Sequence, residues 1–154
     1  MRITIAAVGR LRNGPMRDLC NLYLRRIDWP VRVIEVEAPA QRNAIARRAR
    51  EGERLLRALP DTARTIVLDE RGQTVGSAGF ARRLADWRDK GVRDLAFVVG
   101  GADGFAPSVL ERADWTVAFG TMTWPHELAR VMLIEQIYRA RTIMTGHPYH
   151  RGAK

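Results

Sequence analysis

Two hydrophobic patterns alternate along this chain: short runs of aliphatic residues, and longer stretches in which apolar residues keep the three-and-four spacing of a helix face. The short runs predict five strands, over residues 3–8, 31–36, 64–68, 95–99 and 115–119. The run at 95–99 is apolar throughout, which is typical of a strand buried on both faces. We therefore expect helices to cover this strand from both sides.

Helices are expected between and after the strands, over residues 16–27, 41–59, 77–91, a short segment from 107, and 125–145. Gly52 should weaken the second helix, and Ser77 is expected to cap the third. Alternation of strands and helices predicts an α/β fold, a mostly parallel sheet with helices on both faces. No linker or repeat divides the chain, so residues 1–154 are interpreted as one domain. Ligands of such sheets bind at the carboxyl ends of the strands.

The last helix is apolar on more than one face. Residues 131–134 are four consecutive apolar residues, and Ile137, Tyr138, Ile143 and Met144 follow. One face can pack on the sheet, and another could pack on a second copy of the chain. Complete burial inside a monomer would produce the same pattern, so it favours a homodimer only modestly.

The composition is strongly basic. Lys and Arg total 26 against 17 acidic residues, a formal net charge of +9, and all the basic residues but Lys90 and Lys154 are arginine. Such a charge attracts polyanions, and arginine suits phosphate groups. A GC-rich genome would explain the choice of arginine but not the excess of basic residues, so a nucleic-acid partner is favoured.

Several classes of protein are not expected. The single cysteine, Cys20, permits no intramolecular disulfide and lies on an apolar helical stripe, and the Cys and His spacing matches no zinc site. The first apolar run is too short for a signal peptide, and no run is long enough to span a membrane. We therefore expect a cytoplasmic protein without a metal.

Four arginines share one face of the second helix. Arg47, Arg50, Arg54 and Arg57 follow the spacing i, i+3, i+7 and i+10. A charged stripe is usually a solvated surface. On a chain of this charge, we favour contact with RNA phosphates.

Three strand ends could form ligand loops. Residues 99–105, Val-Gly-Gly-Ala-Asp-Gly-Phe, follow the buried strand, and glycines there permit close approach of a ligand or simply a tight turn. Residues 119–126 offer backbone donors, two hydroxyls and apolar groups, which suits an uncharged aromatic such as adenine; alternatively, Thr123 caps a helix and Trp124 packs in the core. Residues 68–72 form a strand end that enters a turn.

The C-terminal segment 146–151 is rich in groups that can move protons. It contains His147, Tyr149 and His150 around a proline. A polar tail usually frays, and a lone histidine there is more often idle than catalytic.

Taken together, these segments resemble the RlmH type of large-subunit ribosomal RNA pseudouridine N3-methyltransferases, within the SPOUT superfamily. The matching motifs are Ile-Ala-Ala-Val-Gly at 5–9, the glycine-containing loop, Met-Thr-Trp-Pro-His at 122–126, Ile-Glu-Gln-Ile-Tyr-Arg-Ala at 134–140 and His-Pro-Tyr-His at 147–150. They span essentially the whole chain, and their order and spacing are together highly specific.

The resemblance implies a C-terminal trefoil knot and a homodimer. It implies an S-adenosylmethionine-dependent enzyme that methylates a pseudouridine of 23S ribosomal RNA, in the stem-loop that bridges the subunits, on assembled ribosomes. Carried over by position, the cofactor contacts would be Leu68, Gly100, Phe119, Gly120, Thr121, Met122, Thr123 and Trp124. Ala102 and Asp103 stand where the family pattern has Pro and Glu, which puts a catalytic role of that acid in doubt.

The N3 proton of pseudouridine must leave before methyl transfer, so a base or a positive charge should help. His150 and Tyr149 are predicted to lie near the reacting base, and Arg139 to hold an anion or the target nucleotide. Glu135 precedes Arg139 by one turn, so a simple i,i+4 pair is an equal alternative. Arg130 and Glu127 are expected to form a structural pair. The main competing function is a non-catalytic ribosome-binding factor, followed by a small-molecule enzyme on a flavodoxin-like sheet.

Overall fold

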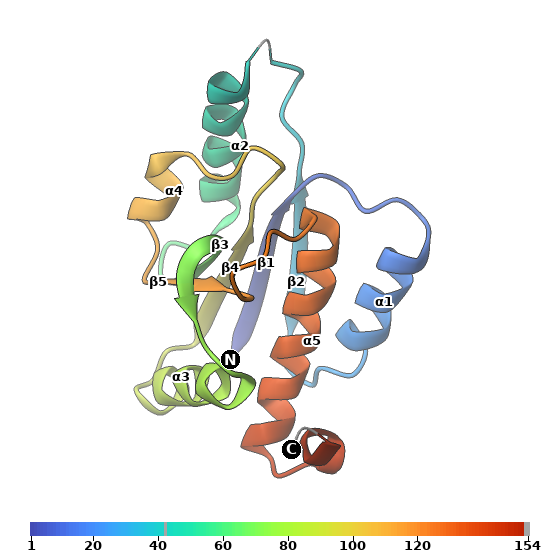
Figure 1. Cartoon of the computed structure of the whole chain (residues 1–154). Coiled ribbons are helices and arrows are strands. Elements are labelled where there is room, and N and C mark those ends of the chain that lie inside the picture. The colour runs from blue at the N-terminus through green and yellow to red at the C-terminus, as the bar shows by residue number, and fades with distance from the viewer. Residues whose placement is uncertain (42, 153–154) are drawn as a thin grey trace.

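The computed structural model describes residues 1–41 and 43–152, and it contains one five-stranded sheet flanked by helices (Figure 1). The strands are β1 Arg2–Val8, β2 Val31–Val36, β3 Arg64–Thr74, β4 Asp94–Val99 and β5 Trp115–Ala118. The helices are α1 Pro15–Leu24, α2 Ala44–Ala58, α3 Ser77–Asp89, α4 Pro107–Glu111 and α5 His126–Met144, followed by a short 3-10 helix η1, Pro148–Gly152. The predicted α/β class and all five strands are confirmed.

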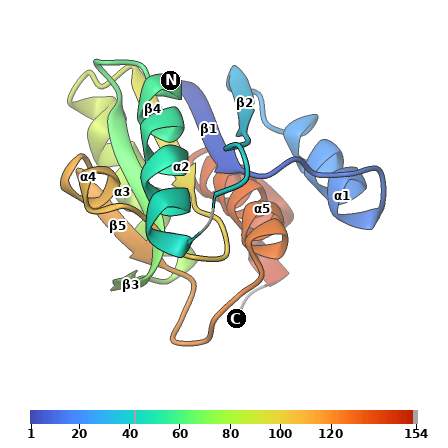
Figure 2. The ribbon, with the colours of Figure 1, turned by 90° about the horizontal axis from the view of Figure 1, so that it is seen from above.

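The sheet runs in the order β2-β1-β4-β3-β5, and every neighbouring pair is parallel. Alternate residues of β1 point to opposite faces: Ile3 and Ile5 pack with α1, α3 and α5, whereas Ala6 and Val8 pack with α2 and α4 (Figure 2). Burial on both faces explains the continuous apolar run at 95–99, of which no residue is more than 2% exposed.

β3 continues further than expected. The sequence predicted a strand over 64–68 and then a turn, but β3 extends to Thr74 and pairs with β5 in two registers, so that Leu68 and Gln73 both lie opposite Val117. Gly72 makes this possible, because a Cβ on it would lie 2.6 Å from the backbone nitrogen of Val117. β3 therefore bends against β5, which no local pattern in β3 could reveal.

Two of the predicted helix details are wrong. α3 is capped by Gly76, and Ser77 instead donates its hydroxyl to Gln136 of α5 at 2.8 Å. α2 is continuous through Gly52, and a Cβ there would lie 3.0 Å from Ala106, so the glycine also allows close packing near α4. α2 also begins later than predicted, with Asn43 as its N-cap.

Within the described residues, no helix is long and apolar enough to cross a membrane.

Candidate functional site

Residues 68–71 in the middle of β3 and the loops that follow β4 and β5 line a cavity of about 950 Å³, here called the loop cavity. They meet there because the carboxyl ends of neighbouring parallel strands lie on one edge of the sheet. Of the predicted cofactor residues, those that line it are Leu68, Gly100, Phe119, Gly120, Met122, Thr123 and Trp124. Thr121 is exposed and does not line the loop cavity. His126 also lines it, as the last residue of the predicted loop 119–126, whereas Arg48 of α2 lines it from outside the predicted loops.

The glycine loop, residues 99–105, is a tight turn that also lines the loop cavity. Gly101 and Gly104 form an antiparallel bridge, and Gly104 has a φ of 76°. Gly100 is required for packing, because a Cβ on it would lie 2.9 Å from the ring of Phe105. The Cβ side of Gly100 is thus filled by Phe105, while Gly100 itself lines the loop cavity. The tight-turn interpretation explains the glycines, and the loop still faces the loop cavity.

The loop between β5 and α5 closes the cavity from another side. Thr123 donates its hydroxyl to Glu70 at 3.0 Å, and the indole nitrogen of Trp124 donates to the carbonyl of Phe119 at 3.2 Å. The alternatives are therefore not supported: Thr123 does not cap α5, whose N-cap is Pro125, and Trp124 is 39% exposed rather than part of the core. Gly120, with a φ of 103°, permits the sharp bend after β5.

Acidic and basic groups around the loop cavity are mostly paired. Asp103 accepts a hydrogen bond from Arg47 at 2.7 Å, which ties the glycine loop to α2. This pairing supports the doubt about a catalytic Asp103, because its carboxylate has a structural partner. Asp69 likewise binds the guanidinium of Arg71 at 3.0 Å.

The tail does not fray, because α5 ends in a turn that sends it back along the helix. Gly146 has a φ of 68°, and the amide of His147 donates to the carbonyl of Thr142 at 2.9 Å. Residues after it form η1, where Tyr149 packs its ring 4.7 Å from that of Tyr138, measured between centroids. His150 is half-buried, and its Nδ1 is buried without a hydrogen-bond partner among the described residues.

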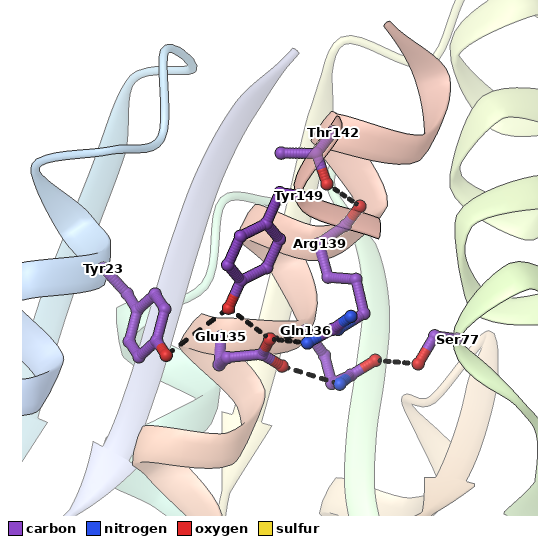
Figure 3. Close-up of polar contacts among 7 residues, drawn as sticks. All are labelled: Tyr23, Ser77, Glu135, Gln136, Arg139, Thr142 and Tyr149. Carbon is purple, nitrogen blue, oxygen red and sulfur yellow. Dashed lines mark hydrogen bonds and ion pairs between the residues drawn. The ribbon is translucent and has the colours of Figure 1, made fainter. Parts of the chain in front are cut away.

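Glu135 brings two of the three predicted catalytic residues together (Figure 3). Its Oε1 accepts hydrogen bonds from Arg139 at 2.6 Å and from the Tyr149 hydroxyl at 3.0 Å. The i,i+4 pair is therefore present, and the guanidinium of Arg139 also lies 4.9 Å from the centre of the Tyr149 ring. Gln136 donates to the other oxygen of Glu135 at 2.7 Å and accepts from Ser77. The sequence singled out neither Gln136 nor Ser77 for this network.

Tyr149 is held as a hydrogen-bond donor. Burial raises the pKa of its phenol well above the usual range, and the contacts with Tyr23 and Glu135 raise it further. The hydroxyl therefore keeps its proton at neutral pH. Tyr149 can orient a neighbouring group through its hydroxyl, but it is poorly suited to remove a proton from a substrate.

A second cavity of about 530 Å³, here called the α5 cavity, lies beside this cluster. Its lining includes Leu19, Tyr23, Glu135 and Gln136, and it shares residues 117–120 at the end of β5 with the loop cavity. Leu19 and Leu22 of α1 are each 40% exposed. An apolar surface thus borders the middle of α5.

Within one chain, the tail and the loop cavity remain apart. Residues 146–150 line neither cavity, and the tail lies at the opposite end of α5 from the loop after β5 (Figure 1). The Tyr149 hydroxyl reaches back only to Glu135, nine residues from His126, or about 13 Å along a helix. The structure therefore groups the predicted cofactor residues and, separately, the predicted catalytic residues.

The arginine stripe on α2 is divided. Arg47 pairs with Asp103 and Arg50 pairs with Glu53, whereas Arg54 and Arg57 are exposed and form no ion pair with any described residue. The double substitution that best tests RNA contact is therefore at 54 and 57.

Arg130 is the largest departure from the predicted pairs. It does not bind Glu127; it is 1% exposed and donates to Glu35 at 2.7 Å and to the carbonyls of Val8 and Gly9 at 3.0 and 2.7 Å. The only sequence signal for these contacts was the position of an arginine next to the apolar residues 131–134 of α5.

Among the described residues, no cluster of side chains could hold a metal ion.

Comparison with known proteins gives consistent results along the whole chain. A family model described as "Predicted SPOUT methyltransferase" matches residues 1–150. A "Ribosomal RNA large subunit methyltransferase H" from Paramagnetospirillum magneticum is 51% identical over 151 residues, covering 98% of this chain and 99% of that protein. Proteins of the same name from Rhodospirillum centenum and Ruegeria sp. are 54% and 50% identical, with the same coverage.

Proposed function

The chain belongs to the SPOUT methyltransferase family, and from this premise we propose that it methylates N3 of a pseudouridine in 23S ribosomal RNA, using S-adenosylmethionine, on assembled ribosomes in the cytoplasm. Family membership implies the trefoil knot that the sequence resemblance predicted. The observation that carries the proposal is the loop cavity, where the predicted cofactor residues other than Thr121 come together.

The lining of the loop cavity fits S-adenosylmethionine. Its volume lies within the usual range for small-molecule sites. Leu68, Phe119 and Met122 offer apolar contacts to an adenine ring, and the backbone of residues 100 and 118–120 offers polar groups. When bound, the cofactor supplies an electrophilic methyl group, so the remaining task of the protein is to orient the acceptor base and remove its proton.

The active form is proposed to be a homodimer in which the tail of one copy completes the loop cavity of the other. This arrangement is supported by the separation of tail and loop cavity in one chain. Glu135 is the midpoint of α5, so a two-fold axis across the α5 cavity would place the end of each α5 near the start of its partner. The exposed Leu19 and Leu22 would be covered by such an interface.

The tail residues then have distinct roles. Tyr149 keeps its proton and donates a hydrogen bond to Glu135, so it orients the target base by accepting a hydrogen bond. Arg139, held by the same carboxylate, stabilises the negative charge that develops on the imide. His150, a half-buried imidazole on the same tail, accepts the N3 proton.

Labelling with the methyl-labelled cofactor tests the function. Purified protein is incubated with ribosomes that lack the modification, with free 23S RNA in parallel, and the label is mapped by nuclease digestion and mass spectrometry. We expect label on N3 of one pseudouridine, with assembled ribosomes only. Cofactor binding without label would refute the proposed RNA substrate but leave the methyltransferase assignment in place. If neither occurs, a ribosome-binding factor becomes the better account.

Arg54 and Arg57 are expected to contact RNA phosphates. Their double alanine variant should bind ribosomes with a salt slope smaller by about 1 to 2, because each lost phosphate contact removes just under one unit. The matched control replaces Arg2 and Arg64, exposed arginines at the amino ends of β1 and β3, on the opposite edge of the sheet. Equal slopes for the two double variants would mean that the stripe is only a solvated surface.

A further inference from the structure

Glu51 is a buried acid that no step described above uses. It lies on α2, it is 8% exposed, and its Oε2 is buried without a hydrogen-bond partner among the described residues. An ionised carboxyl group in such a place is costly unless it is paired. A buried acid with one free oxygen therefore calls for an explanation of what it faces.

The carboxyl group of Glu51 faces the back of the glycine loop. A Cβ on Gly101 would lie 3.1 Å from Oε2 and 3.5 Å from Oε1, so both oxygens lie against this stretch of backbone. Arg47, one turn earlier on α2, holds Asp103 of the same loop. Since Gly101 and Asp103 also line the loop cavity, α2 supports from behind the loop that forms the cavity wall.

The charges around Glu51 make this support depend on its protonation. Burial raises the pKa of the Glu51 carboxyl group, Asp103 raises it further, and Arg47 opposes them. These two residues are the charged groups whose fields reach it: the nearby element β1 presents the apolar Val8 to the same glycine. Once ionised, Glu51 repels Asp103 and competes with it for Arg47.

We propose that Glu51 is a positioning residue for the glycine loop: when it is protonated, the Arg47–Asp103 pair holds the loop against α2, and when it is ionised, it weakens that pair and releases the loop. Cofactor affinity should therefore weaken as the pH rises through the titration of Glu51. Binding should be coupled to proton uptake, because the bound form favours the protonated acid. The proposal rests on the proposed function in one respect: it takes the loop cavity to be the cofactor site.

Calorimetry with S-adenosylhomocysteine, a stable analogue of the cofactor, tests the proposal. Binding to the wild type is measured between pH 5 and pH 8, in buffers of different ionisation enthalpy, which report the protons taken up on binding. Any titration of the ligand itself affects all variants equally. In the wild type, Kd should rise by up to about tenfold per pH unit within the titration, with proton uptake. Glu51→Gln mimics the protonated form and should show tight, less pH-dependent binding without that uptake. Glu53→Gln, an exposed acid on the same helix, should match the wild type.

Equal pH profiles and equal proton uptake in the wild type and Glu51→Gln would overturn the proposal. If Glu51→Gln does not fold, as judged by circular dichroism, Asp103→Asn replaces it. Removing that carboxylate should move the midpoint of the profile to lower pH, and an unmoved midpoint would also overturn the proposal. If the wild type itself binds no S-adenosylhomocysteine, the cofactor cavity and the proposed function fail together with this inference.

Discussion

An alanine at position 150 is expected to lower turnover by about 10²–10⁴-fold, with cofactor affinity nearly unchanged. His150 is the tail group best suited to accept the N3 proton, because Tyr149 keeps its own proton and Arg139 is bound to Glu135. His150 is proposed to act on the acceptor base, and it is not among the residues proposed to contact the cofactor, so cofactor binding should not depend on the histidine. Single-turnover methylation of unmodified ribosomes measures the first quantity, and calorimetry the second.

His147→Ala is the matched control. His147 is an exposed imidazole on the same tail, where it accepts a hydrogen bond from the amide of Tyr149 at 3.2 Å. Its loss should alter turnover much less than the loss of His150. Unchanged turnover in His150→Ala would remove that histidine from the mechanism. A weakened cofactor affinity in His150→Ala would indicate that the tail shapes the cofactor site instead.

Mixed dimers test whether His150 acts across the interface. One partner carries His150→Ala, and the other carries Gly120→Val, which places a β-branched residue at a φ of 103° in the loop cavity. If the tail acts on the partner, each mixed dimer has one site with both defects and one intact site. An equal mixture should then recover roughly a quarter of wild-type activity, since half of the dimers are mixed. No recovery in mixtures shown to contain mixed dimers would indicate that the tail acts in its own chain.

Arg130→Met is expected to lower the free energy of unfolding by about 3–5 kcal/mol. The guanidinium is 1% exposed, and its loss leaves the carbonyls of Val8 and Gly9 and the carboxylate of Glu35 without this donor. These contacts join α5 to the ends of β1 and β2, so no other described residue replaces them directly. Urea unfolding followed by circular dichroism, at one fixed protein concentration, measures the change.

Arg141→Met controls for the loss of an arginine from the same helix. Arg141 forms a two-pronged ion pair with Asp28 at 2.7 and 2.8 Å, but the Asp28 side chain is 60% exposed. Such a surface pair contributes at most about 1 kcal/mol. If the two variants lose similar stability, the buried contacts of Arg130 contribute no more than a surface pair, and the expectation is wrong.

The strands were predictable because burial on both faces leaves a local record. A strand such as β4 must be apolar at nearly every position, and this is visible without knowing its neighbours. Glycines were harder to interpret. Gly52 resembles a helix breaker in isolation, but its role depends on Ala106, which is distant along the chain. Likewise, the packing of the Phe105 ring against the Cβ side of Gly100 could not be predicted from the glycine alone.

The candidate site was predictable to the extent that it follows from strand order. Segments at the ends of parallel strands meet at one edge, so the sequence identified most of the walls of the loop cavity, but not Arg48 of α2 or Ala129 of α5. Partners of long side chains were not predictable. Thr123 could have capped a helix and Arg130 could have bound Glu127, but they bind Glu70 and Glu35, which lie far away in sequence.

By itself, the sequence determined the α/β class, the order of its elements and the loops after β4 and β5, because the hydrophobic period and the turn residues act locally. Only the tertiary structure decided how β3 bends against β5, that Glu135 holds Tyr149 and Arg139, and that Glu51 lies behind the glycine loop. These features depend on contacts between residues far apart in the chain. A hydrogen bond or a buried charge is set by distance in space, which the spacing of residues along the chain does not encode.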